Sequence, residues 1–339
     1  MHPAGPPYVL PTHTPSLFRS AVVEAAARLR AGDIVAVPTE TVYGLAADAR
    51  NAVAVAKIFA AKGRPAHNPV IVHVAGGDLA RACVATWPAT AERLARAFWP
   101  GPLTLVLPKA ADIPEVVTAG GPTVGIRWPR HPFMQALITE CGCPLAAPSA
   151  NAANQLSPTT AGHVQRSLGA SVPLIVDGGS CAVGLESTVV DLTVEPPRVL
   201  RPGMVTAAAL RDVLGALSTD RSAEGDSPRR SPGQLPRHYA PRARLLVNRW
   251  TDSAELLAWL NGRHLTAATT YVLAHTHLPS PEGLAGVSLV PYDPEAFARA
   301  LYAELHRVDA LGVDAIVVEA VPEEGEWAAI ADRLRRAAA

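Results

Sequence analysis

The sequence predicts an α/β protein in which helices flank a twisted, mixed sheet, and a smaller α/β unit follows. Three observations support this fold class. Stretches with helical spacing of apolar residues alternate with short apolar runs of strand length. Polar side chains gather where several of these runs end. The chain has 339 residues, more than one domain usually contains, and its composition changes after residue 217.

The elements of the first part are predicted in chain order from spacing and from glycine positions. Residues 16–29 place apolar side chains at helical spacing, and a Gly-Asp pair then precedes the apolar strand 34–39. A helix over 53–61 ends at Gly63, and the β-branched strand 68–75 follows. The later expected elements are a helix over 91–98, strands over 103–108 and 123–129, a helix over 132–140, and strands over 145–151, 173–179 and 187–193. Apolar strands that alternate with helices indicate a largely buried sheet.

A linker interrupts this alternation. Between residues 217 and 244 the chain is rich in Ser, Pro, Gly, Arg and acidic residues and has no apolar periodicity. Beyond it we expect a smaller, Rossmann-like unit with strands over 243–248, 269–275 and 314–321 and helices over 252–260, 294–308 and near 327–336. The predicted organisation is a first domain over 1–216, a Pro- and Arg-rich linker over 217–242, and a C-terminal α/β domain over 243–339.

The composition argues against several classes of protein. Thirty basic and thirty acidic residues balance, which disfavours a surface built as a whole to hold nucleic acid or an anionic membrane. Four cysteines form no C-x-x-C pair and no zinc-binding spacing with histidine, so we expect them to be small buried side chains. No apolar run reaches the ~18 residues of a membrane span, and the N-terminus lacks a signal-peptide pattern. We therefore expect a cytoplasmic protein.

Polar groups mark the ends of several predicted strands. The segment PTETVYGL (38–45) ends one strand, Arg127 ends another, and APSANAANQLSP (147–158) follows a third. The loop KGRPAHNP presents Lys62 and Arg64 on a backbone that prolines stiffen. Because polar groups at several strand ends of an α/β sheet converge on one crevice, we expect a ligand site there. No lysine follows a glycine, so a P-loop is excluded, and separate strand-end groups would hold a nucleotide.

Seven motifs, in this order, resemble the YrdC/Sua5 family: PTETVYGL, KGRPxxNPVIVHV, FWPGPLTLVL, GIRWPRHP, APSAN, GLESTVVD and VLRPG. The similarity runs from about residue 16 to 339, and SPGQLPRHYAP (231–241) with the C-terminal domain is similar to the long, Sua5-type members. The resemblance implies a YrdC-like catalytic domain with L-threonylcarbamoyladenylate synthase activity. Such a nucleotidyltransferase forms threonylcarbamoyl-AMP and pyrophosphate from L-threonine, bicarbonate or CO2, and ATP.

The resemblance also implies partners and a lid. The product would pass to a tRNA threonylcarbamoyl-transferase for t6A modification of tRNA, with no membrane involved and tRNA binding possible but not required. Both the carbamate and the mixed anhydride decompose in water, so the enzyme should close during chemistry. Residues 231–241 would reach back over the active site as a lid. Relatives often carry a lysine and an aromatic residue where this lid has Gln234-Leu235-Pro236, and commonly Asn where the last helix has Asp332.

Two sets of site residues follow from the resemblance. The ATP set is Lys62, Arg64, Asn68, Thr123, Ser149, Asn151, Ser157, Arg201 and Tyr239, with Lys62 and Arg64 as catalytic residues and Mg2+ as the expected cofactor. The threonine set is Thr41, His73, Arg127, Ala147 and Ser187. Cations suit this reaction because negative charge builds on phosphate oxygens as the carbamate attacks and pyrophosphate leaves. A guanidinium such as that of Arg127 can fork onto a carboxylate.

Some interpretations stay open at the level of the sequence. Thr39 and Tyr43 would line the threonine site, where Gly44 lets the backbone turn, or they are ordinary strand and turn residues. His73 equally suits a core position, and Glu40 would either bind metal or only be solvated. The metal ligands are unknown.

Two alternative functions also stay open. One is the carbamoyl-adenylate-forming module of hydrogenase-maturation carbamoyltransferases, whose zinc-finger cysteine pairs and acylphosphatase-like region this sequence lacks. The other is a non-enzymatic RNA-binding YrdC-like module. Zero net charge, and the lack of aromatic residues interleaved with the arginines, disfavour it.

Overall fold

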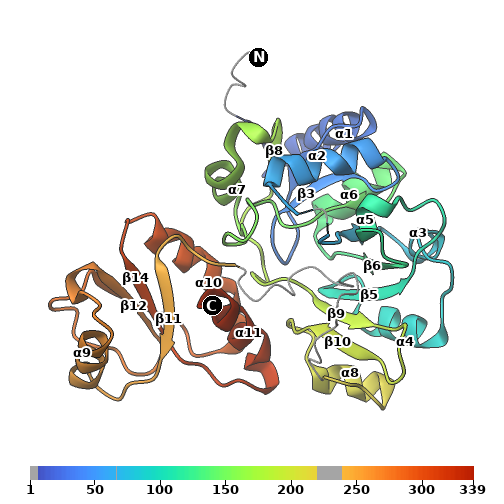
Figure 1. The fold of residues 1–339 in the computed structure, drawn as a ribbon. Coiled ribbons are helices and arrows are strands. Elements are labelled where there is room, and N and C mark those ends of the chain that lie inside the picture. Colours follow the sequence, from blue (N-terminus) through green and yellow to red (C-terminus); the bar gives the residue numbers. More distant parts are fainter. Residues whose placement is uncertain (1–6, 66, 220–238) are drawn as a thin grey trace. The chain divides into compact units, whose positions relative to one another are not determined.

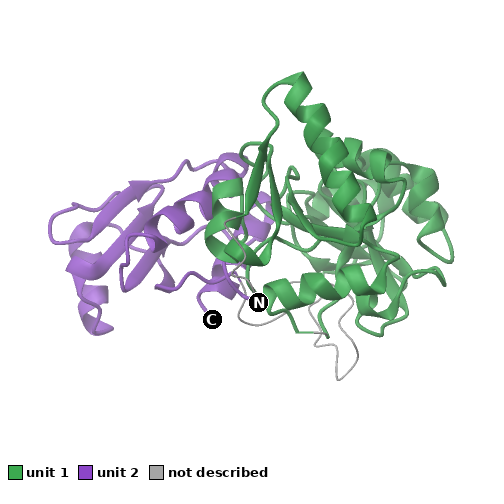
Figure 2. Cartoon of the chain, turned by 90° about the horizontal axis from the view of Figure 1, so that it is seen from above, with its two compact units in different colours: residues 1–153, 157–234 green, residues 154–156, 235–339 purple. Residues whose placement is uncertain are grey.

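The computed structural model describes residues 7–65, 67–219 and 239–339. The chain divides into two compact units, residues 1–153 with 157–234 and residues 154–156 with 235–339 (Figure 2). Most of the predicted linker lies outside the described residues, so the predicted domain bounds stay a prediction. The expected class, a mixed α/β unit followed by a smaller α/β unit, is confirmed.

In its described part, the first unit is built on a ten-stranded sheet with the order β1-β8-β2-β3-β7-β4-β6-β5-β9-β10 (Figure 1). The strands are β1 (Tyr8–Pro11), β2 (Val35–Val37), β3 (Gly44–Asp48), β4 (Ile71–His73), β5 (Leu103–Pro108), β6 (Thr123–Arg127), β7 (Leu145–Ala146), β8 (Leu174–Asp177), β9 (Thr188–Asp191) and β10 (Arg198–Arg201). The helices are α1 (Pro15–Arg30), α2 (Ala52–Lys62), α3 (Gly77–Ala82), α4 (Ala89–Phe98), α5 (Glu115–Thr118), α6 (Pro132–Cys141), α7 (Ala161–Leu168) and α8 (Ala207–Leu214), with the short 3-10 turn η1 (Gly169–Ser171). Parallel pairs such as β4 with β6 and antiparallel pairs such as β2 with β3 make the sheet mixed.

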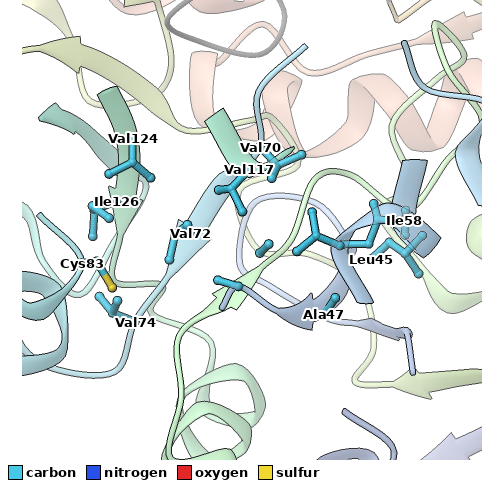
Figure 3. Close-up of a cluster of buried hydrophobic side chains, with 14 of the residues drawn as sticks. Leu45, Ala47, Ile58, Val70, Val72, Val74, Cys83, Val117, Val124 and Ile126 are labelled. Carbon is cyan, nitrogen blue, oxygen red and sulfur yellow. The ribbon is translucent and has the colours of Figure 1, made fainter. Parts of the chain in front are cut away.

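Both faces of this sheet are buried. Alternate residues of a strand point to opposite faces, and along β2 Ala36 belongs to one apolar cluster while Val35 and Val37 belong to another. The cluster of Ala36 also contains side chains of β4, β6 and α2, part of which Figure 3 shows. The cluster of Val35 packs against α1 and α6. A sheet covered in this way exposes its polar groups mainly where strands end.

Local capping places the basic loop at one of these ends. Asn51 caps α2, because its side chain accepts hydrogen bonds from the backbone N–H groups of Val53 and Ala54. The helix ends at Lys62, and Gly63 follows with a φ of 59°, a left-handed conformation that glycine adopts without steric cost. The chain therefore leaves the helix abruptly, with Lys62 at its buried end.

The second unit contains, in its described residues, a four-stranded parallel sheet with the order β11-β14-β12-β13. Its strands are β11 (Arg244–Asn248), β12 (Thr270–Ala274), β13 (Gly286–Leu289) and β14 (Ala315–Glu319). Its helices are α9 (Ser253–Gly262), α10 (Pro294–Asp309) and α11 (Ala328–Ala337), with the 3-10 turns η2 (Ala267–Thr269) and η3 (Gly325–Trp327). The short segment 154–156 joins this unit, because Gln155 pairs with Ala240 in a parallel bridge.

The structure contains elements that the sequence analysis did not predict, among them β1, β3, β10, β13 and the helices α3, α5, α7 and α8. PTETVYGL was expected only to end a strand, but its last two residues begin β3, which pairs antiparallel with β2. The residues of β3, Gly-Leu-Ala-Ala-Asp, lack the β-branched and aromatic side chains that mark a strand. Among the described helices, none has both the length and the apolar character needed to cross a bilayer.

Candidate active site

The turn between β2 and β3 is built from buried hydroxyl groups. Thr39 Oγ1 accepts hydrogen bonds from the backbone N–H groups of Thr41 and Val42, at 3.2 and 3.3 Å, and donates to Val42 O at 2.7 Å. Its hydroxyl also lies 2.9 Å from that of Thr41. Thr39 therefore shapes the turn, and Thr41 is presented at a fixed position.

The end of this turn is joined to the segment 147–158. Tyr43 donates its backbone N–H to Pro158 O and accepts from Ala150 N, both at 2.8 Å. A Cβ on Gly44 would lie 3.2 Å from the Cβ of Ala147, a tight contact, so glycine favours the close approach of the two segments here. The expectation that Gly44 lets the backbone turn was wrong, because this residue begins β3. The Tyr43 hydroxyl is also occupied: it donates to Gly179 O at 2.7 Å and accepts from Gly178 N at 3.1 Å.

Arg127, at the end of β6, is the central cation beside this turn. Its Nη1 donates to Thr41 Oγ1 at 2.8 Å, its Nη2 lies 2.8 Å from Glu40 Oε1, and its Nε donates to Gly101 O at 3.3 Å. Arg127 and Glu40 are both buried. Burial is the largest influence and raises the pKa of Glu40, but the Arg127 guanidinium, together with backbone hydrogen bonds at Arg130 and Glu40, holds this pKa below its ordinary value. Glu40 is thus a buried, ionised partner of Arg127 and not a solvated side chain.

His73 lies next to Arg127 across the sheet. It ends β4, is in register with Arg127 of β6, and is buried. Burial, followed by the charge of Arg127, lowers the pKa of His73 to about 3. Its Nδ1 has no hydrogen-bond partner among the described residues. His73 is therefore a neutral imidazole with a buried acceptor or donor atom that a ligand can satisfy.

Ser187 and Arg201 form a second polar pair in the first unit. Arg201 of β10 donates from Nη2 to Ser187 Oγ at 3.1 Å and from Nε to Ser187 O at 3.0 Å. Ser187 Oγ also lies 2.8 Å from Thr104 Oγ1 in β5. Thr104 was not predicted, since an alternating apolar strand gives no sign that its single hydroxyl contacts a site residue.

Lys62 is buried and donates hydrogen bonds from Nζ to the carbonyl oxygens of Ser149 and Asn151. Burial, with a smaller contribution from Arg64, holds the pKa of Lys62 well below its usual value. The predicted Lys62, Ser149 and Asn151 are thus brought together. The contact joins the end of α2 to the loop that follows β7.

Arg64 fixes the rest of the basic loop. Its Nε donates to Asn68 O at 3.2 Å and its Nη2 to Pro69 O at 2.7 Å. Asn68 Oδ1 is buried and has no hydrogen-bond partner in the described part of the chain. This amide oxygen can therefore accept a hydrogen bond from a ligand.

Three further predicted residues lie in different parts of the described structure. Ser157 Oγ donates to Glu186 Oε1 at 2.5 Å, a carboxylate that the sequence analysis passed over although it stands beside Ser187 in the GLESTVVD motif. Thr123 begins β6, about 13 Å from Arg127 at roughly 3.3 Å per residue. Tyr239 belongs to the second unit, where its ring centroid lies 6.1 Å from that of Tyr302 and 5.1 Å from the Arg333 guanidinium.

Comparison with known proteins assigns the chain to a family. A family model described as telomere recombination, Sua5_yciO_yrdC, matches residues 27–203, and one described as threonylcarbamoyl-AMP synthase, C-terminal domain, matches residues 205–339. The chain belongs to the Sua5/YrdC family. Together the two models cover nearly the whole sequence, so the resemblance that the motifs indicated is confirmed.

Individual members of the Sua5/YrdC family match along most of their length. Threonylcarbamoyl-AMP synthase of Pyrococcus abyssi is 38% identical over 331 residues, 92% of this chain and 92% of that protein. The protein of the same name in Bacillus subtilis is 41% identical over 334 residues, 94% and 92% of the two chains. A crystal structure of Pyrococcus abyssi Sua5 complexed with L-threonine matches with a TM-score of 0.87 at 37% identity, covering 97% of this chain and 96% of that one.

Proposed function

We propose that the chain is an L-threonylcarbamoyladenylate synthase, a nucleotidyltransferase that converts L-threonine, bicarbonate and ATP into threonylcarbamoyl-AMP and pyrophosphate. The observation that carries the proposal is the buried Arg127, which lies beside Thr41 with His73 next to it. The fold around this group matches a Sua5 protein solved with L-threonine. Relatives that cover more than nine-tenths of the chain carry the name of this activity.

Threonine suits the side chains at this position. A guanidinium forms charge-assisted hydrogen bonds with a carboxylate, and Arg127 is preorganised by Thr41, Glu40 and the Gly101 carbonyl. Glu40 supplies a negative charge for the substrate ammonium group. His73 Nδ1 is buried without a hydrogen-bond partner among the described residues, and the β-hydroxyl of threonine would supply one. A ligand that lacks this hydroxyl would leave the nitrogen unpaired and would therefore bind less well.

The nucleotide would lie against the basic loop. Arg64 and Arg201 supply positive charge for the polyphosphate, the buried Lys62 holds the neighbouring loop through the Ser149 and Asn151 carbonyl groups, and Asn68 Oδ1 accepts a hydrogen bond from the nucleotide. No group of three or more metal-ligating side chains occurs among the described residues. Mg2+ needs no such group, because it commonly binds through one or two carboxylates together with substrate phosphates. Glu186, beside Ser157, is the carboxylate that we propose for it, and the bound ion would neutralise phosphate charge.

The remaining parts of the proposal concern partners. Threonylcarbamoyl-AMP is a reactive mixed anhydride, so a tRNA threonylcarbamoyl-transferase that forms t6A would consume it. The proposed location is the cytoplasm, where ATP and tRNA occur together. The lid, residues 231–241, falls mostly outside the described residues, and its contact with the nucleotide through Tyr239 stays a prediction.

Mass spectrometry of the products tests the proposed function. The full chain is incubated with ATP, bicarbonate, Mg2+ and a panel of amino acids, and each component is omitted in turn. We expect threonylcarbamoyl-AMP and pyrophosphate only when threonine and bicarbonate are both present. Serine should react less well, although loss of one methyl contact is worth only about 1–3 kcal/mol. A carbamoyl-adenylate formed without an amino acid, or tRNA binding without any ATP turnover, would overturn the proposal.

A further inference from the structure

A Cys-Gly-Cys turn leads from α6 into β7. Cys141 is the last residue of α6, and Gly142 has a φ of 68° and a ψ of 15°, in the left-handed region. Cys143 follows and precedes Pro144. From the sequence, all four cysteines were predicted to be buried. Cys83 and Cys181 are buried, whereas Cys141 and Cys143 are only half-buried. These two thiols lie at the end of a helix, where neighbouring elements leave them partly open.

The geometry of the turn brings the two thiols together. A left-handed residue mirrors the right-handed helical conformation, so the Cα atoms on either side of Gly142 are about 5.4 Å apart by helix geometry. Disulfides join Cα atoms roughly 4.4–6.8 Å apart. The two thiols also lie close enough for each to shift the pKa of the other.

The surroundings make the two thiols unequal. The neighbouring Cys143 thiol and the Arg30 guanidinium, which donates to Glu140 O, lower the pKa of Cys141 against the effects of burial, Asp48 and Glu140. The neighbouring Cys141 thiol, burial and Asp48 raise the pKa of Cys143. Cys141 is therefore the thiol that ionises first, and Cys143 keeps its proton. A reactive thiolate beside a protonated partner is the arrangement that thiol exchange requires.

The backbone on each side of the turn is held independently. Gly142 N donates to Ile138 O at 3.0 Å, and Arg30 Nη1 donates to Glu140 O at 2.8 Å. On the strand side, Ala49 N donates to Pro144 O at 2.9 Å. These contacts hold the backbone of the turn, so the cysteine side chains are the part of it that can move.

From this geometry we infer that Cys141 and Cys143 form a modification site that exchanges with low-molecular-weight disulfides. The Cys141 thiolate attacks one sulfur of a disulfide RSSR, forming a mixed disulfide and releasing RS−. Cys143 then gives up its proton and attacks the Cys141 sulfur, which releases the second thiol. In balance, two protein thiols and RSSR give one intramolecular disulfide and two RSH. Nothing in this inference depends on the proposed synthase activity.

The test uses the full chain in mixtures of reduced and oxidised glutathione, followed by alkylation and peptide mapping. We expect a disulfide within the peptide that contains both residues. Cys143→Ser should accumulate glutathione at Cys141, whereas Cys141→Ser should form an adduct at Cys143 several-fold more slowly, because burial and Asp48 still hold the pKa of the Cys143 thiol above its ordinary value. Cys83→Ala/Cys181→Ala, which keeps the pair as the only thiols, is the matched control and should react like the wild type.

Three results would overturn the inference. They are equal adduct rates for Cys143→Ser and Cys141→Ser, a disulfide that forms only between two molecules, and a pair that stays reduced at every glutathione ratio while an unfolded control is oxidised. Circular dichroism of each variant shows that the comparison is made on folded protein.

Discussion

At the scale of single residues, the buried charge of Arg127 affects both the stability of the fold and the binding of threonine. The guanidinium lies within 2.8 Å of both Thr41 Oγ1 and Glu40 Oε1. Removing one member of a buried ion pair typically costs about 3–5 kcal/mol, because the other charge stays buried without compensation. Truncation of Arg127 to alanine would therefore mix a stability effect with a binding effect. A variant that keeps the charge separates the two.

Arg127→Lys should weaken threonine binding while it leaves most of the stability. Lysine keeps the positive charge beside Glu40 but lacks the planar guanidinium that can donate two hydrogen bonds to a carboxylate. Loss of one charge-assisted hydrogen bond costs about 1.5–3 kcal/mol, or roughly 10- to 100-fold in affinity. Calorimetric titration with threonine and with ATP, together with thermal unfolding, measures the change. Arg64→Ala is the matched control, since it should lower turnover without changing threonine affinity. Equal losses of both ligands in both variants would contradict this assignment.

His73 should make stability depend on pH. The unfolded chain takes up a proton on this histidine near pH 6.5, whereas the folded chain does so only near pH 3. Between these values the unfolded state binds more protons, so stability falls as the pH falls. The loss between pH 6.5 and 4.5 is about 2–3 kcal/mol. Urea unfolding of the wild type and His73→Asn checks this, because the variant should lack that part of the slope. Parallel pH profiles would show that His73 is not buried in its neutral form.

At the scale of elements, the motif VLRPG has a steric explanation. A Cβ on Gly203 would lie 2.4 Å from Thr188 N and 2.7 Å from Ser187 C, both rigid backbone atoms at the start of β9. The chain after β10 can therefore pack against β9 only with glycine at this position. The contact also holds Arg201 where it donates to Ser187.

Gly203→Ala should destabilise the first unit by about 1–3 kcal/mol, as overpacking usually does, and should weaken threonine binding through Ser187. Gly162→Ala is the control, because the new Cβ in α7 would meet only side-chain atoms at ordinary contact distance, Arg166 Nη1 at 3.5 Å and Thr160 Oγ1 at 3.8 Å. Alanine favours a helix by up to ~1 kcal/mol over glycine, so this control should be neutral or stabilising. Thermal unfolding of both variants decides the matter; similar melting temperatures for the two would refute the steric explanation.

The sequence predicted elements best where one signal dominated. The run LTLVLP gave β5 with its observed bounds, and helical spacing with Gly32 and Gly63 gave α1 and α2 within a residue or so. β3 was missed because pairing with β2 and β7, and not strand propensity, makes it a strand. The polar groups at the ends of predicted strands indicated that Lys62, Ser149 and Asn151 lie close together. They did not indicate that Glu40 pairs with Arg127. A carboxylate beside three hydroxyl residues gives no sign of which cation it will meet.

For the whole molecule, the first question is which unit holds the C-terminal end of the predicted lid. Ala240 N donates to Asn154 O at 3.0 Å, and Tyr239 is buried beside Tyr302. The C-terminal end of the predicted lid is thus anchored within the second unit. The preceding residues of the lid lie outside the described residues, so their behaviour is an open prediction.

Residues 231–238 should lose amide protection in the free protein and gain it with ATP and threonine bound, because a closed lid excludes water from the carbamate. Hydrogen exchange read by mass spectrometry measures this. Ala240, whose N–H is already hydrogen-bonded, serves as an internal reference and should stay protected in both states. Exchange that ignores both ligands would refute the lid.

Truncation after Leu217 should leave a folded first unit with little synthase activity. All ten strands of its sheet precede this point, but the segment 154–156 would lose its pairing with Ala240. Circular dichroism and product analysis measure folding and activity separately. A truncated chain that forms the adenylate at the full-length rate would require another role for the second unit, such as docking of the next enzyme.

The pairing of Gln155 with Ala240 also sets an order of events during protein synthesis. The ribosome completes every strand of the large sheet before it translates Ala240, so Gln155 emerges long before its partner exists. The segment 154–156, which follows the loop whose carbonyl groups receive Lys62, therefore gains its pairing late, when the C-terminal unit leaves the exit tunnel. Nascent chains stalled before and after this point should differ in protease cleavage within 147–158. Translation itself would then leave the segment 154–156 without its partner strand until Ala240 has been made.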